Sequence, residues 1–348
     1  MADVLLRELT NTDLDWLVTT GQHDTVSAEQ VMLRPNDPWD AIYVLLEGGV
    51  TLFQGDSGDR PLTTINRGEI FGEAPLFDLP SLGMVKAVQP SQVITIPKGL
   101  LTTKLAEDMT FAAHFYRAIA VMLSERLRSM FEMSDKLNLG KAHAVKEALF
   151  IFSELRDSDV DWLISAGKVE KLSADRVLLQ VGRPVDALHL VLDGRFSIAV
   201  PDSYCNPLSM CFISLEKRSR NYQVFAEISK GGLPGIISFL DSRPMPVTIR
   251  SLGDSLVFTI PRSAMTVKLQ TDMGFASRFY RVIAVQISEL LQTVMEQLVG
   301  GSTATQGSNG GVQAMSNVMD DDELDLDDLQ QVSQGAARFN WMLEQLGL

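Results

Sequence analysis

The 348-residue sequence predicts a mainly β fold with flanking α-helices, arranged as two tandem jelly-roll domains that are each followed by an amphipathic helix. The main observation is an internal repeat. The segment Asp15-Trp16-Leu17 recurs 146 positions later, and Phe115-Tyr116-Arg117 recurs 164 positions later. A repeat of about 130 residues is too long for a solenoid unit and has the size of a self-contained domain. The larger second spacing means that the second copy carries extra residues between Gly194 and Thr259.

A second observation is a series of short strand-like runs separated by turn residues. In the first copy these runs are Gln30–Leu33, Ala41–Leu46, Gly49–Gln54, Pro61–Ile65, Val85–Val88 and Gln92–Ile96. Short runs at such spacing are typical of an antiparallel sandwich or jelly roll rather than of a parallel sheet.

Each copy is expected to begin with a short helix and to end with a longer one. Thr10 can cap the first short helix, and Asp157 or Ser158 can cap its counterpart. Near the end of each copy, side chains recur at helical spacing. They are Phe115, Ile119, Met122, Leu123, Arg126 and Leu127 in the first copy, and Phe279, Ile283, Gln286, Ile287 and Leu290 in the second. These faces first cover their own sandwich, and the surface left over favours packing of copy on copy or of subunit on subunit, so a homo-oligomer is expected.

The domain organisation follows from these elements. We expect a first domain over 1–134, a helical linker over 135–150, a second domain over 151–299, a flexible linker over 300–319 and an acidic tail with a closing helix over 320–348. The composition from Gly300 to Gly311 is rich in Gly, Ser, Thr, Asn and Gln, which is typical of a flexible linker.

The tail combines an acidic run with an apolar helix. Seven of the nine residues from 320 to 328 are acidic, and Ser333 is the expected N-cap of the closing helix. An acidic run is usually solvated, whereas an apolar helix face needs a partner. The candidate partner-binding residues are Phe339, Trp341, Met342 and Leu346. Their partner is either another protein or one of the chain's own domains.

Composition and charge exclude several classes of function. The formal net charge of −14 argues against nucleic-acid binding, which depends on Lys and Arg. The two cysteines, Cys205 and Cys211, favour a reducing compartment over a disulfide framework. The sequence shows neither a signal peptide nor an apolar run long enough to span a membrane. We therefore expect a soluble, cytoplasmic protein with no membrane partner.

No motif in the sequence indicates catalysis or metal binding. The four histidines are scattered without metal-ligand spacing, and the acidic run lacks the Gly and Glu of a calcium loop. The glycine-rich segment 231–235 lacks the Lys of a P-loop, and no Ser/His/Asp arrangement is evident. The enlarged segment Tyr204–Tyr222 is either a partner-contact loop or an elongated hairpin. We expect no enzymatic activity and no metal.

Two glycine-rich signatures carry a resemblance to a known family. Glu47-Gly48-Gly49-Val50, followed by 67–73 with the sequence Arg-Gly-Glu-Ile-Phe-Gly-Glu, resembles the cyclic nucleotide-binding domain family. The resemblance covers residues 5–130 and 151–297, and it implies a jelly roll in which a short helix and loop form a ligand cassette. In that family an arginine and backbone N–H groups hold the cyclic phosphate, and a glutamate holds the ribose. The residues that this assigns to ligand binding are Phe71, Gly72, Glu73, Ala74, Ser81 and Leu82 in the first copy, and Gly235, Met245, Val247 and Thr248 in the second.

Both cassettes depart from the family pattern. The phosphate arginine is replaced by Ser81 in the first copy and by Met245 in the second, and neither can form a bidentate, charge-assisted contact. Pro75 and Pro246 each remove a backbone donor. Glu73 keeps the family's glutamate in the first copy, whereas Ile stands in its place in the second. We expect cyclic nucleotide binding in the usual manner to be weaker by a factor on the order of 10³ or more.

These features predict a non-catalytic regulatory or scaffold protein whose C-terminal tail engages a partner or the chain's own domains. The alternative is a ligand sensor, in which the first domain binds a cyclic nucleotide or a related small molecule and transmits binding through its terminal helix. No other cofactor is expected. The double domain with its acidic, aromatic-ended tail resembles tandem proteins of this kind from cyanobacteria.

Overall fold

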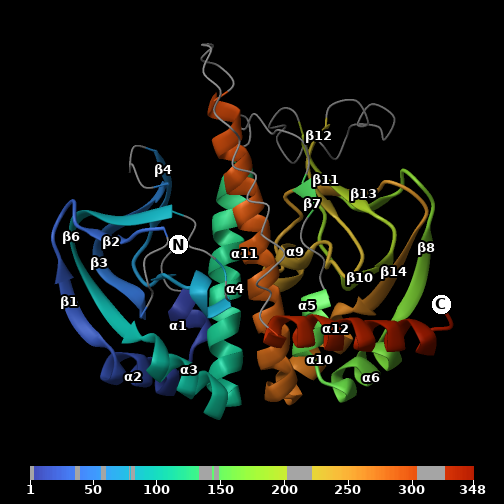
Figure 1. The fold of residues 1–348 in the computed structure, drawn as a ribbon, viewed down its shortest axis with the longest axis horizontal. Coiled ribbons are helices and arrows are strands. Elements are labelled where there is room, and N and C mark those ends of the chain that lie inside the picture. The colour runs from blue at the N-terminus through green and yellow to red at the C-terminus, as the bar shows by residue number, and fades with distance from the viewer. Residues whose placement is uncertain are drawn as a thin grey trace. The chain divides into compact units, whose positions relative to one another are not determined.

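The computed structural model describes residues 4–35, 40–55, 60–77, 79, 83–132, 143–144, 149–201, 222–303 and 326–348. The chain divides into two compact units (Figure 1). One consists of residues 1–132 together with 266–295, and the other of 133–265 together with 296–348. The predicted mainly β fold with two jelly-roll domains and flanking helices is confirmed.

The first jelly roll is one continuous sheet. Its strands are β1 (Gln22–Val26), β2 (Val31–Leu33), β3 (Ala41–Gln54), β4 (Pro61–Ile65), β5 (Ile70–Phe71) and β6 (Gly83–Pro97). The order is β1-β6-β3-β4, with β2 paired to β6 and β5 paired to β3, and every ladder is antiparallel. The long strands β3 and β6 each join two runs that the sequence separates, because the ladder between them continues through register shifts at Leu45–Val50. Strands β1 and β5 were not predicted, because β1 is largely polar and β5 has only two residues.

The second jelly roll has two sheets. Its strands are β7 (His143–Ala144), β8 (Lys168–Leu172), β9 (Val177–Leu179), β10 (Ala187–Asp193), β11 (Phe196–Pro201), β12 (Tyr222–Ile228), β13 (Thr248–Ser251) and β14 (Ser255–Pro261). One sheet has the order β10-β14-β8 and the other β7-β12-β11-β13-β9. Residues 143–144 were expected to be helical, but they form β7, parallel to β12. Most of the enlarged segment, including both cysteines, lies outside the described residues.

The helices of the first copy frame its sheet. They are α1 (Val4–Glu8), α2 (Asn11–Thr20), the 3₁₀ helix η1 (Ala74–Phe77), α3 (Lys98–Glu107) and α4 (Met109–Glu132). The predicted cap at Thr10 is confirmed. Its hydroxyl accepts the N–H of Asp13 at 3.3 Å, and the carboxylate of Asp13 accepts the N–H of Thr10 at 2.8 Å, which completes a capping box.

The helices of the second copy differ from the prediction in their limits. They are α5 (Leu149–Glu154), α6 (Asp157–Ala166), α9 (Ile236–Asp241), α10 (Arg262–Thr271), α11 (Met273–Thr303) and α12 (Leu326–Gln345). The cap predicted at Asp157 or Ser158 is wrong, because α6 already includes Asp157 and the N-cap position is Arg156. Helix α11 extends into the segment expected to be a flexible linker, and α12 begins before Ser333. The rest of that linker and the first part of the acidic run lie outside the described residues.

The core of the first unit is built around α4. Between Phe111 and Leu123 every residue of this helix is buried except His114 and Arg117. A helix that is buried on nearly all sides must have packing partners around it. One of them is α11 in the same unit, where the Arg117 guanidinium lies 5.9 Å from the ring centre of Tyr280.

Among the described helices, none is both long and apolar enough to cross a membrane.

Candidate functional site

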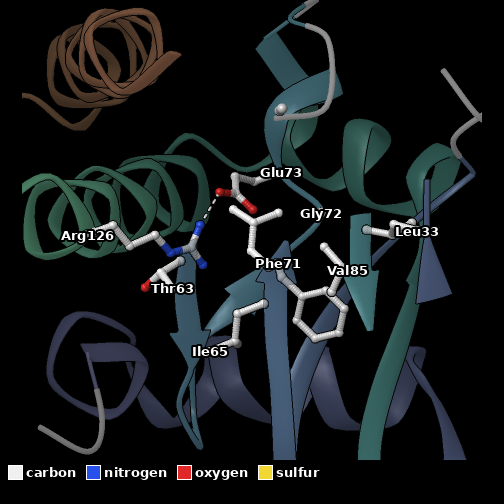
Figure 2. A pocket seen from close by; sticks show the side chains of 10 residues that line it. Leu33, Thr63, Ile65, Phe71, Gly72, Glu73, Val85 and Arg126 are labelled. Atoms are coloured by element: carbon white, nitrogen blue, oxygen red, sulfur yellow. Dashed lines mark hydrogen bonds and ion pairs between the residues drawn. The ribbon is translucent and has the colours of Figure 1, made fainter. Parts of the chain in front are cut away.

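The cassette of the first domain forms part of a small, partly open cavity beside β5 (Figure 2). Its volume is about 40 Å³. It is lined by Leu33, Leu52, Thr63, Ile65, Phe71, Gly72, Glu73, Ala74, Val85 and Arg126. A cavity of this size holds water molecules, whereas pockets for drug-sized ligands are about 300–1,000 Å³. The cavity as it stands is too small for a nucleotide.

Two opposite charges meet at the edge of this cavity. Arg126, from α4, donates from Nη1 to Oε1 of Glu73 at 2.5 Å (Figure 2). Its Nη2 donates to the carbonyl oxygen of Ile70 at 2.6 Å. The side chains of Arg126 and Glu73 are only 10% and 8% exposed. Among the described residues, the buried Nε of Arg126 has no hydrogen-bond partner. A charge-assisted pair shielded from water in this way is stronger than one on the surface.

The presence of Arg126 corrects the expectation that the first cassette lacks a guanidinium. The family pattern places the arginine after Pro80, whereas the guanidinium here belongs to the terminal helix α4. The helical spacing could have indicated the position of this guanidinium, because Arg126 follows Met122 by four residues on the predicted apolar face. The Sδ of Met122 accepts the N–H of Ile70 at 3.3 Å, so both side chains contact β5. A charged residue within an apolar stripe needs a buried partner, and Glu73 is that partner.

The other residues predicted for this cassette have different surroundings. Phe71 is buried and stacks on Tyr43 with ring centres 5.1 Å apart, so it belongs to the core. Gly72 and Ala74 line the cavity, while Ser81 and Leu82 lie outside the described residues. Backbone N–H groups of the segment that follows Glu73 also donate within that segment. The N–H of Leu76 donates to Glu73 O at 2.9 Å, and the N–H of Leu79 donates to Ala74 O at 3.3 Å.

The cassette of the second domain is filled with apolar side chains. Gly235 precedes α9, and a Cβ atom built there would lie 2.3 Å from the Leu179 Cδ1 and 3.6 Å from both the Met245 sulfur and the Val185 Cγ2. Met245 and Val247, both predicted ligand-binding residues, are 2% exposed. The side chain that replaces the family's phosphate arginine therefore helps to fill the cassette.

The polar groups of the second cassette are bonded within the chain. The N–H of Met245 donates to Arg183 O at 2.8 Å, and its carbonyl oxygen accepts the N–H of Gly182 at 2.8 Å. Thr248, another predicted ligand-binding residue, is buried, and its hydroxyl accepts the N–H of Val181 at 3.3 Å. These groups satisfy each other and offer little to a ligand.

A half-buried arginine near the second cassette also bonds within the chain. Arg262 donates to the carbonyl oxygens of Val185, Ser238 and Phe239 at 2.6–2.9 Å. Two of these carbonyls belong to α9, so the guanidinium caps the C-terminal end of that helix. Burial lowers the pKa of Arg262, and nearby Asp186 partly opposes that shift. Arg262 is therefore structural and does not replace the missing phosphate arginine.

The internal repeat aligns the two cassettes once a gap of one residue is allowed in the first. Glu73 corresponds to Ile236, and the 164-residue spacing pairs Arg126 with Leu290. Both members of the ion pair are thus apolar in the second copy. Replacing a buried ion pair with two apolar residues keeps a core stable, whereas replacing one member leaves a buried charge without a partner.

Two further predictions concern metals and the tail. Among the described residues, no group of three or more His, Cys, Asp or Glu side chains is placed to hold a metal ion. Of the tail residues, Phe339 and Met342 are buried within the second unit, and Trp341 and Leu346 are partly exposed. Partner binding by these four residues stays a prediction.

Comparison with known proteins identifies the family. The family model for the cyclic nucleotide-binding domain matches residues 24–108 and 169–272, which together are more than half of the chain. No curated protein matches. Similar solved structures include the regulatory domain of Toxoplasma gondii PKA with cAMP, at 14% identity and a TM-score of 0.29, covering 78% of this chain and 89% of that one. Another is the regulatory subunit of a cAMP-independent protein kinase A from Trypanosoma cruzi bound to guanosine, at 13% identity and a TM-score of 0.29, covering 78% of this chain and 81% of that one. The chain belongs to the cyclic nucleotide-binding domain family and contains two copies of its domain.

Proposed function

We propose that this chain is a non-catalytic regulatory protein in which neither domain holds a cyclic nucleotide in the family's usual manner. The observation that carries the proposal is the ion pair between Glu73 and Arg126. In the family the glutamate holds the ribose, but here its carboxylate already accepts a hydrogen bond from a buried guanidinium. A nucleotide would have to break this contact before it could use Glu73.

The balance of hydrogen bonds is unfavourable for such an exchange. Each hydrogen bond to a charged group contributes roughly 1.5–3 kcal/mol, and a buried charge that loses its partner costs about 3–5 kcal/mol. The ribose hydroxyl offers one neutral hydrogen bond in place of the guanidinium. The second cassette provides no compensation, because Leu179, Val185 and Met245 fill it. The two domains then serve as surfaces for protein contacts.

A second candidate function, that of a sensor, is favoured by one specific observation. Within the part of the chain that the structure describes, the buried Nε of Arg126 has no hydrogen-bond partner, and Arg126 and Glu73 both line the cavity. A small anionic ligand that bound Arg126 would compete with Glu73. Because Arg126 belongs to α4, breaking its contacts with Glu73 and Ile70 would release this part of the helix from β5. Ligand binding would then shift a conformational equilibrium.

Thermal-shift measurements on the full chain distinguish the two functions. The probes are cyclic AMP, cyclic GMP and inorganic phosphate, and the matched control is the double variant E73I/R126L, which copies the second cassette. Our proposal predicts no change in melting temperature with any probe. A dose-dependent rise in the wild-type chain that is absent in the double variant would establish the sensor instead.

The absence of catalysis is tested separately. The chain is incubated with cyclic AMP or cyclic GMP, and the nucleotides are then separated by chromatography. We expect both compounds to be recovered unchanged. A product that forms in proportion to protein concentration would contradict this part of the proposal.

A further inference from the structure

The closing helix α12 packs on α5 and α6 in the second unit (Figure 1). Phe339 and Met342, which lie on the covered face, are 1% and 0% exposed. Asn340 and Glu344 are exposed to solvent. The helix is therefore amphipathic and has a defined buried face.

Phe339 is the aromatic anchor of this contact. Its ring meets the ring of Phe152 in α5 edge to face, with centres 5.0 Å apart and planes at 72°. The ammonium of Lys230, in the segment between β12 and α9, lies 5.0 Å from the centre of the same ring. Edge-to-face packing and a cation above the ring both add to the burial of the aromatic surface.

Arg338 supplies a polar and directional contact. Its Nε donates to Oδ1 of Asp157 at 2.8 Å, and its Nη1 donates to the carbonyl oxygens of Phe152 and Ser153 at 3.1 Å each. These carbonyls lie in the last turn of α5, and Asp157 begins α6. A single guanidinium thus recognises the turn between the two helices.

The equivalent face of the first copy lacks these features. At the 146-residue spacing, Leu6 corresponds to Phe152, and Asn11 corresponds to Asp157. Leu6 is 59% exposed, whereas Phe152 is fully buried. The first copy therefore has neither the aromatic ring nor the carboxylate that holds α12, and this binding face belongs to the second domain alone.

We propose that the face formed by α5, α6 and Lys230 is a docking site for an amphipathic helix with an Arg-Phe-x-x-Met pattern, and that it takes α12 from a second copy of the chain. In the structure the site is filled by the chain's own α12. Residues 304–325 connect α11 to α12, and covalent geometry allows a 22-residue segment to span up to about 70–80 Å. This length is several times the diameter of a helix, so the covalent connection alone does not confine α12 to its own domain. A tethered helix competes at an effective concentration on the order of millimolar, so exchange increases when the contact in cis is weakened.

Binding of a labelled peptide to the full chain tests this proposal. The probe is a fluorescent peptide with the sequence of residues 326–348, and it represents the tail of a second copy. The variant R338A/F339A weakens the contact in cis, and N340A, on the exposed side of the same helix, is the matched control. We expect the R338A/F339A chain to bind the peptide about ten-fold or more tightly than the wild-type and N340A chains. A peptide that itself carries F339A should not bind any of them. If the folded R338A/F339A chain fails to bind the wild-type peptide, the proposal is wrong.

A second measurement needs no variant of the chain. Hydrogen exchange is followed in the wild-type protein while the unlabelled peptide is added up to millimolar concentration. We expect the exchange of residues 333–345 of the chain's own tail to accelerate with peptide concentration, while that of α2 stays constant. Unchanged exchange in the tail would mean that α12 is a fixed part of the second domain, and it would overturn the proposal.

Discussion

The cassette of the first domain holds Glu73 against Arg126, whereas the equivalent positions of the second domain are occupied by Ile236 and Leu290. The first cassette keeps a cavity of about 40 Å³. In the second, Leu179, Val185 and Met245 surround Gly235 closely. The same backbone pattern is thus completed by a buried ion pair in one copy and by apolar packing in the other.

This difference indicates that the carboxylate of the cassette and the guanidinium of the terminal helix are gained or lost together. A carboxylate in the cassette and a guanidinium in the terminal helix occur together in the first copy and are absent together in the second. Neither charge could be kept alone, because a single buried charge without a partner is strongly destabilising. We infer that the ion pair is a unit of structure in the first domain, whatever ligand its ancestors bound.

The largest expected effect comes from breaking this unit. Glu73→Ala leaves the Arg126 guanidinium buried without its carboxylate, and we expect a loss of about 3–5 kcal/mol in the free energy of unfolding. The variant E73I/R126L, which copies the second domain, should retain wild-type stability or gain about 1–4 kcal/mol. Urea denaturation of the three proteins measures both effects.

The double variant serves as the control for the single one. If Glu73→Ala and E73I/R126L lose the same stability, the two residues do not act as a pair. Stability of Glu73→Ala equal to that of the wild type would show that Arg126 finds water or another partner, and would contradict its assignment as a buried, paired charge.

A smaller effect tests how tightly the second cassette is filled. Gly235 has a φ of +79°, and an added Cβ would lie 2.3 Å from Leu179. Gly182 has nearly the same φ, +77°, but no atom of the described residues lies within 4 Å of its added Cβ. Gly182→Ala should lower the free energy of unfolding by about 1–2 kcal/mol, because alanine disfavours the left-handed backbone conformation. Gly235→Ala should lower it by about 1–3 kcal/mol more, because its methyl group also overpacks the cassette. Equal losses, measured by thermal denaturation, would mean that the second cassette has spare room.

The smallest effect is expected where the two copies are alike. Asp108 accepts the N–H of Phe111 at the start of α4, and Asp272 accepts that of Phe275 at the start of α11. The pKa of Asp108 is lowered first by that backbone hydrogen bond and then by Lys104, and the pKa of Asp272 is lowered first by Lys268 and then by its backbone bond. Substitution of either aspartate by Ala should lower the free energy of unfolding by about 1 kcal/mol at pH 7.

The pH dependence of these caps follows from the direction of the shifts. Because the folded pKa lies below the unfolded value of about 3.9, the stabilisation is present above that pH and is lost as the pH falls through the folded pKa. Unfolding experiments at pH 7 and pH 3 on D108A, D272A and the wild type should show the differences shrinking at low pH. A cost that differs greatly between the two copies, or that persists unchanged at pH 3, would disprove their equivalence.

The fold could be predicted because repeated motifs and short runs between turn residues can be recognised without knowing which strands pair. The run Pro61–Ile65 contains three β-branched residues, which favour a strand, and Thr10 with Asp13 forms a capping box within four residues. The limits of longer elements could not be predicted in this way. The runs within β3 and within β6 merge because the ladder between the two strands continues past the turn residues, and this pairing links distant parts of the chain.

The site was predicted less completely for the same reason. Glu73 was identified from its motif, but its partner Arg126 lies in another element, and only the face of a predicted helix pointed toward it. The filled state of the second cassette depends on Leu179 and Val185, which no ligand motif contains. The docking of α12 depends on Asp157 and Lys230, whose contacts with the tail arise only from the tertiary fold.

Isothermal titration calorimetry of the full wild-type chain with cyclic AMP and with cyclic GMP tests the central claim most directly. Because Glu73 is already paired and the second cassette is filled, we predict no saturable heat of binding at micromolar nucleotide. Saturable binding with a micromolar dissociation constant, at one site or at two, would show that a nucleotide displaces Arg126 or opens the second cassette, and it would contradict the account.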